Sequence, residues 1–418
     1  MSPGEFEVTR IGPCRFRSPL EDASFVDDGA RVLFDASLEA VRAAKEPPQF
    51  ELAGPRREIR FDPRGLRCGI VTCGGLCPGL NDVIRAVVLA LHYQYGVTGT
   101  VGFRYGYEGL TSRHEPMALT PDVVSRIHEH GGTILASSRG NQDVGEMTDT
   151  LARMRIGILF AAGGDGTLRG AHAIADEARR RKLDLAVIGI PKTIDNDISC
   201  IQTSFGFQTA VSEARRATQA AHAEAKGARN GVGLVKLMGR DSGFIAAFAA
   251  LADPQVNFCL VPEVPFTPAG FLAALERRLE RRGHAVVVVA EGAGSDLKDA
   301  VVGKDASGNV KTRDVGTWLR DAIAERFGKG VNLKYIDPSY TIRSVPADPF
   351  DAAFCSVLGQ NAVHAGMSGR TDMVVGNWRN EFTHVPIPLA VRERKKIDPL
   401  GWLWRAVLAS TGQPARMA

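Results

Sequence analysis

The sequence predicts an α/β fold of two Rossmann-like domains, whose mainly parallel sheets carry helices on both faces. Two observations support this class. Short apolar runs alternate with glycine-rich turns and with stretches of helical periodicity, and 418 residues exceed the size of one typical hydrophobic core. In sheets of this kind, ligands bind beyond the carboxyl ends of the strands. We therefore expect the functional site at the glycine-rich turns, in the cleft between the two domains.

The clearest strand–turn–helix unit spans residues 156–171. Ile156–Ala162 is an apolar run of strand length, the turn Gly163-Gly164-Asp165-Gly166-Thr167 follows it, and helical spacing begins at Leu168. Glycines allow a close approach to a bound group, and amides at a helix start favour anions. In a phosphate site a carboxylate without a cation would only repel the ligand, so Asp165 is interpreted as a magnesium anchor. The alternative is a tight turn with an exposed aspartate.

Similar units surround this one. In the first half we expect strands at 68–73 and 98–103, helices at 82–93 and 121–130, and glycine-rich turns after Cys73 and Ala136. A further strand at 185–190 ends in the turn Pro191–Asp197. This turn places two carboxylates and a hydroxyl at the carboxyl end of a strand. Such dense polar chemistry favours a functional turn.

The second half continues the alternation. We expect helices at 207–225, 244–251, 271–282 and 351–366, strands at 231–237, 258–261, 285–290, 331–336 and 373–376, and an exposed loop at 303–311. The domain organisation that follows is an N-terminal extension (1–64) that packs on the core, a first α/β domain (65–208 plus about 343–392), a second α/β domain (209–342) and a C-terminal segment (393–418).

Composition excludes several classes of function. No apolar stretch is long enough to span a bilayer and residues 1–17 lack a signal core, so a cytoplasmic protein is expected. The seven cysteines show no metal-ligand spacing and suit reduced thiols. The net charge of +4 is spread along the chain, which indicates neither nucleic acid nor a membrane as a partner.

The remaining motifs suit phosphoryl transfer, in which a protein positions groups and neutralises charge. Neither a Walker phosphate loop, a Gly-x-Ser-x-Gly elbow nor a His-Glu-x-x-His helix occurs. Asp195 could serve as the base for a sugar hydroxyl, and Arg240, beside flexible Gly239, could follow the migrating phosphoryl group. Alternatives stay open: Asp195 and Asp197 could cap the next helix, Arg240 could form a surface ion pair, and Glu291 could merely end a strand.

Taken together, residues 67–400 resemble the phosphofructokinase family. The resemblance rests on Gly-Gly-Asp-Gly-Thr at 163–167, Pro-Lys-Thr-Ile-Asp-Asn-Asp at 191–197, Met-Gly-Arg at 238–240 and Ala-Glu-Gly at 290–292. The first motif alone also resembles those of NAD kinases and lipid kinases, but the set leaves little room for them. The stretches 203–210 and 235–246, with the N-terminal extension, are most similar to the long ATP-dependent members of plants and trypanosomatids.

The resemblance implies transfer of the γ-phosphoryl group of Mg-ATP to the 1-hydroxyl of fructose 6-phosphate, which gives fructose 1,6-bisphosphate and ADP in glycolysis. It implies that the first α/β domain binds the nucleotide and the second the sugar phosphate. Asp195 would be the proton acceptor, with Thr193 and Arg240 as the other catalytic residues, and Asp165 would bind Mg²⁺. The residues implied in ATP binding are Gly75, Arg139, Gly140, Gly164, Asp165, Gly166 and Thr167. Those implied in substrate binding are Thr193, Asp195, Met238, Gly239, Arg240, Glu291, Tyr340 and Arg343.

Two positions bear on the phosphoryl donor. Pyrophosphate-using members usually carry Asp where this chain has Gly166, and that side chain occupies space needed by the α-phosphate of ATP. Lys192, in contrast, is common in pyrophosphate users, and the short bacterial ATP enzymes have Gly there. The long ATP-using members combine Gly and Lys as this chain does, so the resemblance favours ATP.

Departures from the short bacterial members leave subunit-bridging catalysis open. Gly231 and Lys334 stand where those enzymes have two arginines that reach across from a neighbouring subunit, and Tyr340 replaces a histidine. A homo-oligomer, a dimer or tetramer, is still expected. Two further hypotheses remain: a pyrophosphate-dependent phosphofructokinase, and a non-catalytic regulatory paralogue that binds a sugar phosphate or a nucleotide.

Overall fold

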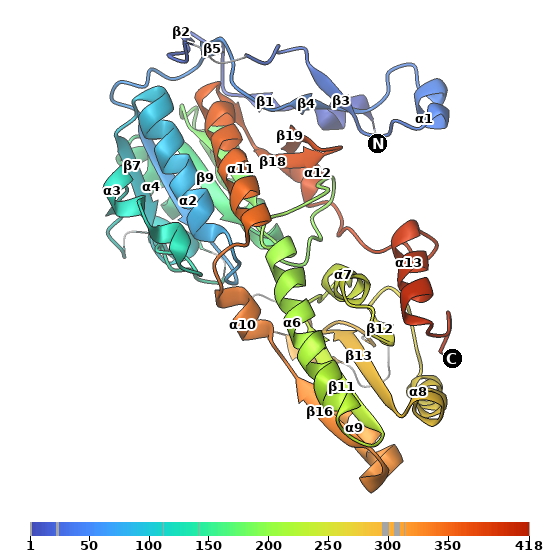
Figure 1. The fold of residues 1–418 in the computed structure, drawn as a ribbon. Helices are drawn as coiled ribbons and strands as arrows, with labels where there is room; N and C mark the ends of the chain where they lie inside the picture. Colours follow the sequence, from blue (N-terminus) through green and yellow to red (C-terminus); the bar gives the residue numbers. More distant parts are fainter. Residues whose placement is uncertain are drawn as a thin grey trace. The chain divides into compact units, whose positions relative to one another are not determined.

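The computed structural model describes residues 2–21, 25–111, 113–140, 142–294, 301–304, 310–312 and 314–417, with the backbone alone at 301–304 and 310–312. The chain forms two compact units (Figure 1). Unit 1 comprises Met1–Thr193, Ile198–Gly206 and Ser344–Glu393, and unit 2 comprises Ile194–Asp197, Phe207–Arg343 and Arg394–Ala418. The motif at 191–197 is therefore divided between the units after Thr193.

Unit 1 is built on a nine-stranded sheet in the described part of the chain. In spatial order its strands are β3 (Arg31–Leu33), β4 (Gln49–Leu52), β19 (Glu381–Pro386), β18 (Met373–Trp378), β10 (Ala186–Pro191), β9 (Ile156–Gly163), β6 (Arg67–Thr72), β7 (Gly99–Phe103) and β8 (Met117–Ala118). The strands from β18 to β7 are parallel, and those at both edges are antiparallel. The parallel centre fits a sheet that is covered on both faces.

Helices cover both faces of this sheet, and every residue of β9 is buried. On one face α4 (Val144–Arg153) and α5 (Asp165–Arg180) enclose a core that contains Leu159, Leu168 and Val187. On the other face α2 (Leu80–Leu89) and α11 (Pro349–Met367) lie side by side (Figure 1). Gly366 of α11 comes so close to Ile158 that an added Cβ would lie 2.8 Å from its Cγ2 atom.

The helix expected at 121–130 is broken. It forms α3 (Pro121–Val124) and a 3₁₀ turn (Ile127–Glu129). The side-chain amide of Asn81 donates to the carbonyls of Ile127 and His130, at 3.0 Å in both cases. Because these carbonyls bond to a side chain of α2, a tertiary contact overrides the local helical pattern.

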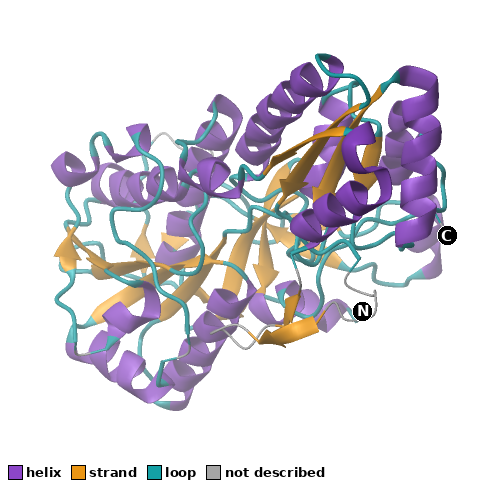
Figure 2. Ribbon diagram, turned by 90° about the horizontal axis from the view of Figure 1, so that it is seen from below, coloured by secondary structure: helices purple, strands orange, loops and turns teal. Residues whose placement is uncertain are grey.

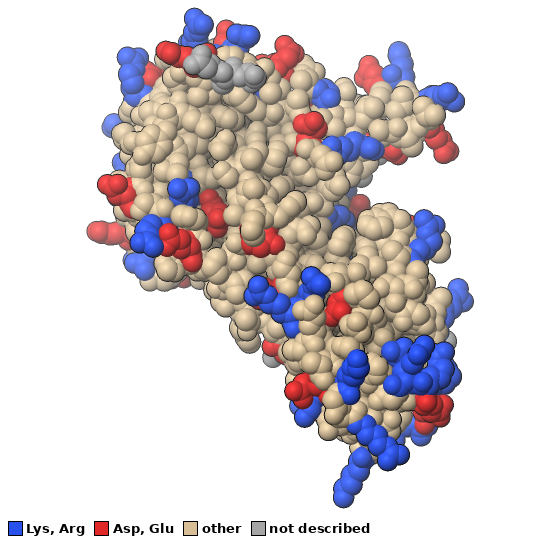
Figure 3. All heavy atoms as spheres, viewed as in Figure 1, with Lys and Arg blue, Asp and Glu red and all other residues tan. Residues whose placement is uncertain are grey.

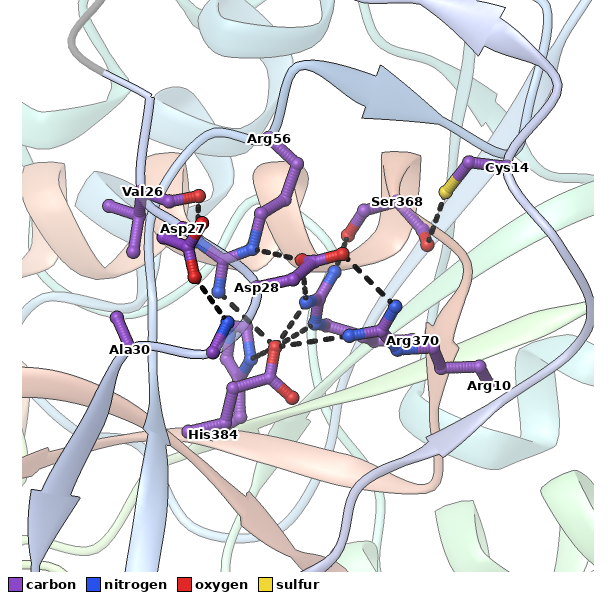
Figure 4. Close-up of polar contacts among 12 residues, drawn as sticks. Arg10, Cys14, Val26, Asp27, Asp28, Ala30, Arg56, Ser368, Arg370 and His384 are labelled. Atoms are coloured by element: carbon purple, nitrogen blue, oxygen red, sulfur yellow. Dashed lines mark hydrogen bonds and ion pairs between the residues drawn. The ribbon is translucent and has the colours of Figure 1, made fainter.

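N-terminal strands extend one edge of the unit 1 sheet, where β4 pairs with β19 and β3 pairs with β4. β1 (Thr9–Arg10) forms a separate two-stranded sheet with β17 (Arg370–Thr371). Figure 4 shows the charged cluster at this junction. The fully buried Arg370 donates from Nε to Glu51 at 2.6 Å and contacts Asp28 at 2.9 Å, and Arg56 donates to Glu51 at 3.2 Å. Charge pairing of this kind fixes the extension to the sheet, since leaving one buried partner alone is strongly destabilising.

Unit 2 holds a four-stranded parallel sheet in the order β12 (Phe258–Leu260), β13 (His284–Ala290), β11 (Gly231–Leu237) and β16 (Asn332–Ile336). On one face α8 (Pro268–Arg282) and α9 (Val315–Phe327) pack on Leu234 and Val287. On the opposite face Gly233 lies against Ala221 of α6 (Phe207–Lys226), and α7 (Phe244–Ala252) contacts β12 and β13. Figure 2 shows strands flanked by helices in each unit. The predicted α/β class is confirmed.

The loop prediction for residues 303–311 is wrong at its two ends. Where residues 303–311 were expected to form an exposed loop, β14 (Val301–Lys304) and β15 (Val310–Thr312) pair antiparallel. Residues 305–309 lie outside the described residues. Valines on both sides of a short polar, glycine-containing stretch favour strand pairing, and this signal outweighed the polar composition.

The remaining helices are short or terminal. They are α1 (Leu38–Ala43), α10 (Ser339–Ser344), α12 (Ile387–Ala390) and α13 (Trp402–Thr411). None of the described helices combines the length and the apolar character needed to cross a membrane. On the face shown in Figure 3, Lys and Arg side chains gather over α8, whose last turn carries Arg281 and Arg282.

Candidate active site

The turn between β9 and α5, residues 163–167, is here named the phosphate turn. A Cβ atom on Gly163 would lie 2.1 Å from Thr167 Oγ1, so only glycine fits at this position. Gly164 is the N-cap residue of α5 and has no side chain to cap the first amides of the helix. Uncapped amides at a helix start favour an anionic ligand. The local sequence therefore places glycine backbone and the first amides of α5 at the carboxyl end of β9, and phosphate binding there stays a prediction.

Asp165 opens α5 with a carboxylate that is about 21% exposed and pairs with Arg169 at 3.0 Å. A carboxylate oxygen in this accessible position is the ligand type that Mg²⁺ prefers, so the residue fits the predicted metal role. A different group, His172, Asp176 and Asp372, brings possible ligand atoms within 4.8 Å of one another. Arg179 contacts both of these carboxylates, at 2.8 and 3.5 Å, so we interpret that group as an ion-pair network.

Neighbouring turns of unit 1 are tied to the phosphate turn. Lys192 donates its backbone N–H to the carbonyl of Gly163 at 2.9 Å and its ammonium to the carbonyl of Gly75 at 2.7 Å. Gly75 lies beside Arg139, whose Nη2 atom would be 3.4 Å from an added Cβ, and Gly140 follows with φ of +113°. The predicted nucleotide residues of unit 1 therefore gather at the carboxyl ends of β6, β9 and β10.

Gly166 faces open space. A Cβ atom built on this residue would meet no heavy atom within 4 Å, and its φ lies outside the left-handed region. Nothing in the fold therefore requires glycine at this position. This separates Gly166 from Gly163, where the packing of Thr167 excludes every side chain.

The second cluster belongs to unit 2 and centres on residues 194–197, here named the acid turn. The Oδ1 atom of Asp195 is buried and has no hydrogen-bond partner, although the residue as a whole is partly exposed. Burial raises the pKa of Asp195 well above its ordinary range, and the negative charges of Asp197 and Glu291 raise it further. A hydrogen bond from the backbone N–H of Arg240 and the charge of Arg343 oppose these effects. A carboxyl group in this state is suited to accept a proton.

The loop after β11 carries the predicted sugar-phosphate residues. Gly239 has φ of +125°, and an added Cβ would lie 2.7 Å from the carbonyl oxygen of Ser242. Gly292 donates to the carbonyl of Gly239 at 3.0 Å, and a Cβ on Gly292 would lie 1.8 Å from the carbonyl oxygen of Arg240. These contacts hold the backbone of Arg240 against the end of β13, where Glu291 lies.

Helix α10 completes the unit 2 cluster. Arg343 donates from Nε to the sulfur of Met238 at 3.2 Å, and Tyr340 is 83% exposed on the same short helix. Unit 2 thus brings together Asp195, Met238, Arg240, Glu291 and Arg343. That this cluster and the phosphate turn converge on one cleft stays a prediction.

One alternative from the sequence does not hold. Asp195 and Asp197 cap no helix, because the next helix, α6, begins only at Phe207. Instead Asp197 is buried and pairs with Arg394 at 2.8 Å. Arg394 and its neighbour Lys395 were missed by the sequence reasoning. Their signal was the stretch 392–396, four basic residues with Glu393 among them, which resembles an ordinary solvated surface segment.

A hollow of about 590 Å³ opens at the amino ends of β11 and β16, the end of the sheet opposite to Asp195. It is lined by Arg229, Asn230, Lys329, Gly330, Val331, Asn332 and Leu333. Gly231 and Lys334, which replace the two bridging arginines of the short bacterial members, adjoin this hollow in the sequence. Lys334 lies 4.0 Å from Glu224.

Comparison with known proteins agrees with the motifs. A family model described as phosphofructokinase matches residues 67–366. The chain is 48% identical over 436 residues to the ATP-dependent 6-phosphofructokinase of Borreliella burgdorferi, and the match covers 99% of this chain and 98% of that protein. It is 50% identical to the ATP-dependent 6-phosphofructokinase of Trypanosoma cruzi, and the match covers 86% of this chain and 76% of that protein. It is 45% identical to ATP-dependent 6-phosphofructokinase 7 of Arabidopsis thaliana, and the match covers 91% of this chain and 81% of that protein.

Solved structures share the fold at low identity. The pyrophosphate-dependent phosphofructokinase from Marinobacter aquaeolei aligns with a TM-score of 0.70 at 20% identity, covering 84% of this chain and 92% of that one. Pichia pastoris phosphofructokinase in the T-state aligns with a TM-score of 0.65 at 22% identity, covering 83% and 39%. The resemblance that the four motifs indicated, including its similarity to plant and trypanosomatid members, is confirmed, and the chain belongs to the phosphofructokinase family.

Proposed function

We propose that this phosphofructokinase is an ATP-dependent 6-phosphofructokinase, which transfers the γ-phosphoryl group of ATP to the 1-hydroxyl of fructose 6-phosphate. The observation that carries the proposal is the acid turn: a buried, partnerless Oδ1 atom on Asp195 beside Arg240 and Arg343. The names of relatives from bacteria, trypanosomatids and plants support the same reaction.

In the proposed mechanism, Oδ1 of Asp195 accepts the proton of the 1-hydroxyl as the hydroxyl oxygen attacks the γ-phosphorus. General-base catalysis of this kind contributes about 10²–10⁴-fold in rate. Arg240 neutralises charge on the migrating phosphoryl group, since a guanidinium stays protonated and matches phosphate oxygens in its fork geometry. Thr193 supports the substrate, and Met238, Gly239 and Glu291 line the sugar. Tyr340 and Arg343 hold the 6-phosphate.

The proposed nucleotide site is the phosphate turn with its neighbours. The uncapped amides of α5, the backbone of Gly75 and the side chain of Arg139 bind phosphate oxygens, together with Gly140 and Thr167. Asp165 would hold Mg²⁺, which when bound neutralises phosphate charge and orients the donor. Its partial exposure and its position at the start of α5 support that role.

ATP is proposed as the donor because of Gly166. The open space beside this residue is compatible with an α-phosphate, and an aspartate there would project a carboxylate into that space. Lys192 does not contradict this assignment, because its ammonium braces the carbonyl of Gly75. The donor preference therefore depends on what occupies the space beside Gly166.

The decisive experiment measures turnover with each donor separately. We expect fructose 6-phosphate-dependent ADP release from Mg-ATP that is much faster than turnover with pyrophosphate. In the variant Gly166→Asp we expect the ATP rate to fall, because like charge and bulk enter the α-phosphate space. Faster turnover of the unchanged protein with pyrophosphate would overturn the donor assignment. Ligand binding without turnover under any donor would favour the non-catalytic regulatory paralogue.

We further propose a cytoplasmic homo-oligomer, a dimer or tetramer. All seven cysteines, each in the described part of the chain, are thiols, which suits a reducing compartment. The cationic hollow near Arg229 and Lys329 is offered as the surface that faces a neighbouring subunit. Sedimentation of the purified chain, with and without fructose 6-phosphate, tests the oligomer, and a monomer at assay concentration would exclude it.

A further inference from the structure

A short C-terminal segment, residues 394–397, crosses the unit 2 cluster, and we name it the C-terminal strap. Its main chain and side chains bond to the acid turn on one side. Asp197 accepts from Arg394 Nη1 at 2.8 Å, and the carbonyl of Asp197 accepts from the backbone N–H of Lys395 at 2.8 Å. Both the carboxylate and the peptide group of Asp197 are therefore fixed by the strap.

The same strap is bonded to the loop that carries Arg240. The hydroxyl of Ser242, a fully buried residue, donates to the carbonyl of Lys395. The backbone N–H of Ile397 donates to Glu263 at 2.9 Å, and Glu263 also accepts from the backbone N–H of Gly243 at 3.0 Å. Thus residues 194–197 and residues 239–243 are connected through a third segment, which lies more than 150 residues further along the chain.

The strap also supplies the positive charge next to the acid turn. The described charged groups around the two aspartates include Glu291 from the end of β13, Arg343 from α10, and Arg394 and Lys395 from the strap. The backbone N–H of Arg240 also bonds to Asp195. Burial lowers the pKa of Lys395 to about 7, against the charge of Asp197, and its Nζ atom lies 5.2 Å from the centroid of the Phe244 ring. Arg394 is therefore the neighbour of Asp197 that stays positively charged, because a guanidinium does not lose its proton.

We propose that Arg394 is a positioning residue for the catalytic base: it balances the charge of Asp197 beside Asp195, while the strap holds the acid turn against the Arg240 loop. This inference rests on the proposed function, in which Asp195 is the base. Without Arg394, the negative charge of Asp197 beside Asp195 is no longer balanced, so Asp195 is expected to release its proton at a higher pH.

The test compares pH profiles of kcat/KM for fructose 6-phosphate in the full chain and in Arg394→Met. We expect the acid limb of the variant to move up by about one pH unit, so that the loss of kcat/KM is about tenfold larger at pH 6 than at pH 9. Lys396→Met is the matched control, because Lys396 is the exposed next-but-one residue of the same basic run. The substrate phosphate ionises identically in every assay, so a displacement between the curves belongs to the protein.

Two further variants separate charge from structure. Arg394→Lys keeps the positive charge, so the acid limb of its pH profile should lie close to that of the wild type. Arg394→Met combined with Asp197→Asn removes both charges and should bring the acid limb back to the wild-type position or below it. A uniform loss at all pH values in Arg394→Met, or an unchanged limb, would overturn the inference.

A second readout does not need activity. The difference in Tm between wild type and Arg394→Met should grow as the pH rises, because the negative charge of the acid turn then lacks its counter-charge. The difference in Tm between wild type and Lys396→Met should not change with pH. If the wild type shows no turnover, the proposed function fails while this readout still tests the charge coupling. If the wild type is active and the Tm difference is flat, the inference fails and the proposed function stands.

Discussion

The phosphate turn and the acid turn both present an aspartate at the carboxyl end of a parallel strand, yet their surroundings are opposite. Asp165 is partly exposed, begins a helix and has a cation, Arg169, one helical turn away. Asp195 has a buried oxygen without a partner, and two further carboxylates add negative charge to its surroundings. The same side chain therefore has different chemical properties at the two positions. An accessible anion can bind a cation, whereas burial and neighbouring negative charge raise the proton affinity of a carboxylate.

Glu51 sharpens this comparison because it is buried and nevertheless ionised. Burial alone would raise its pKa, but His384 and Arg370 outweigh that effect and lower it below its ordinary range. Since burial lowers the pKa of His384 to about 4, this histidine is neutral at pH 7 and the arginines carry the compensation. Burial therefore does not by itself raise a carboxyl pKa. The presence of a positive partner decides the direction.

The largest expected effect is on the base. Asp195→Asn should lower kcat by about 10²–10⁴-fold, because the amide cannot accept the hydroxyl proton. The same change should leave Tm equal or higher at pH 8, because it removes a charge from an uncompensated buried site. The measurements are ADP release and thermal unfolding of the same preparations. Unchanged turnover would remove Asp195 from the mechanism.

The pH dependence of this stability effect has a definite sign. A raised carboxyl pKa means that the folded state binds more protons than the unfolded state between about pH 4 and the folded pKa. Stability contributed by this group therefore falls as the pH rises through that window. The gain in Tm from Asp195→Asn should be absent near pH 4 and largest at alkaline pH. A gain that is constant with pH would contradict the raised pKa.

Glu51→Gln should have the opposite consequence for stability. It leaves the buried Arg56 and Arg370 without their shared counter-charge, which costs about 3–5 kcal/mol in the free energy of unfolding at pH 7. Because the pKa of Glu51 is lowered on folding, this contribution is present above the unfolded pKa of about 4 and disappears as the pH falls below it. Urea unfolding at pH 7 and at acid pH measures both values. A loss of less than about 0.5 kcal/mol at pH 7 would mean that the cluster in Figure 4 is not a coupled network.

Two glycines, Gly292 after β13 and Gly166 in the phosphate turn, provide a smaller test. Gly292→Ala should cost about 1–3 kcal/mol and should also reduce kcat, because the added methyl group collides with the carbonyl of Arg240, whose N–H bonds to Asp195. Gly166→Ala should change stability by less than about 0.5 kcal/mol, because its methyl group enters open space. Equal costs for both substitutions would show that the close contact at Gly292 relaxes without consequence.

The smallest expected effect concerns magnesium. Asp165→Asn should raise the Mg²⁺ concentration required for half-maximal activity by about tenfold, since a neutral amide is a poorer ligand than a carboxylate. Asp176→Asn, an exposed carboxylate further along α5, is the matched control and should leave the Mg²⁺ requirement unchanged. A similar shift in both variants would indicate a general electrostatic effect of the helix, and it would remove the specific role of Asp165.

Local patterns explain what could be predicted from the sequence. The phosphate turn and the acid turn each occupy a few consecutive residues after a buried strand, so spacing and residue type were sufficient to find them. The contacts of Arg394 and Lys395 could not be found in this way. Their partners, Asp197 and Ser242, lie about 150–200 residues earlier in the chain, and a basic run carries no signal of its own for a buried partner. The break in the helix near Ile127 could not be predicted for the same reason, because the side chain of Asn81 that bonds there comes from another element.

The division of residues 191–197 between the units has a consequence for substitutions within this motif. The ammonium of Lys192 bonds to the carbonyl of Gly75 in unit 1. Asp195, only three residues later, accepts from the backbone N–H of Arg240 in unit 2. A substitution of Lys192 is therefore expected to disturb the turn at Gly75, whereas a substitution of Asp195 is expected to disturb the loop that carries Arg240.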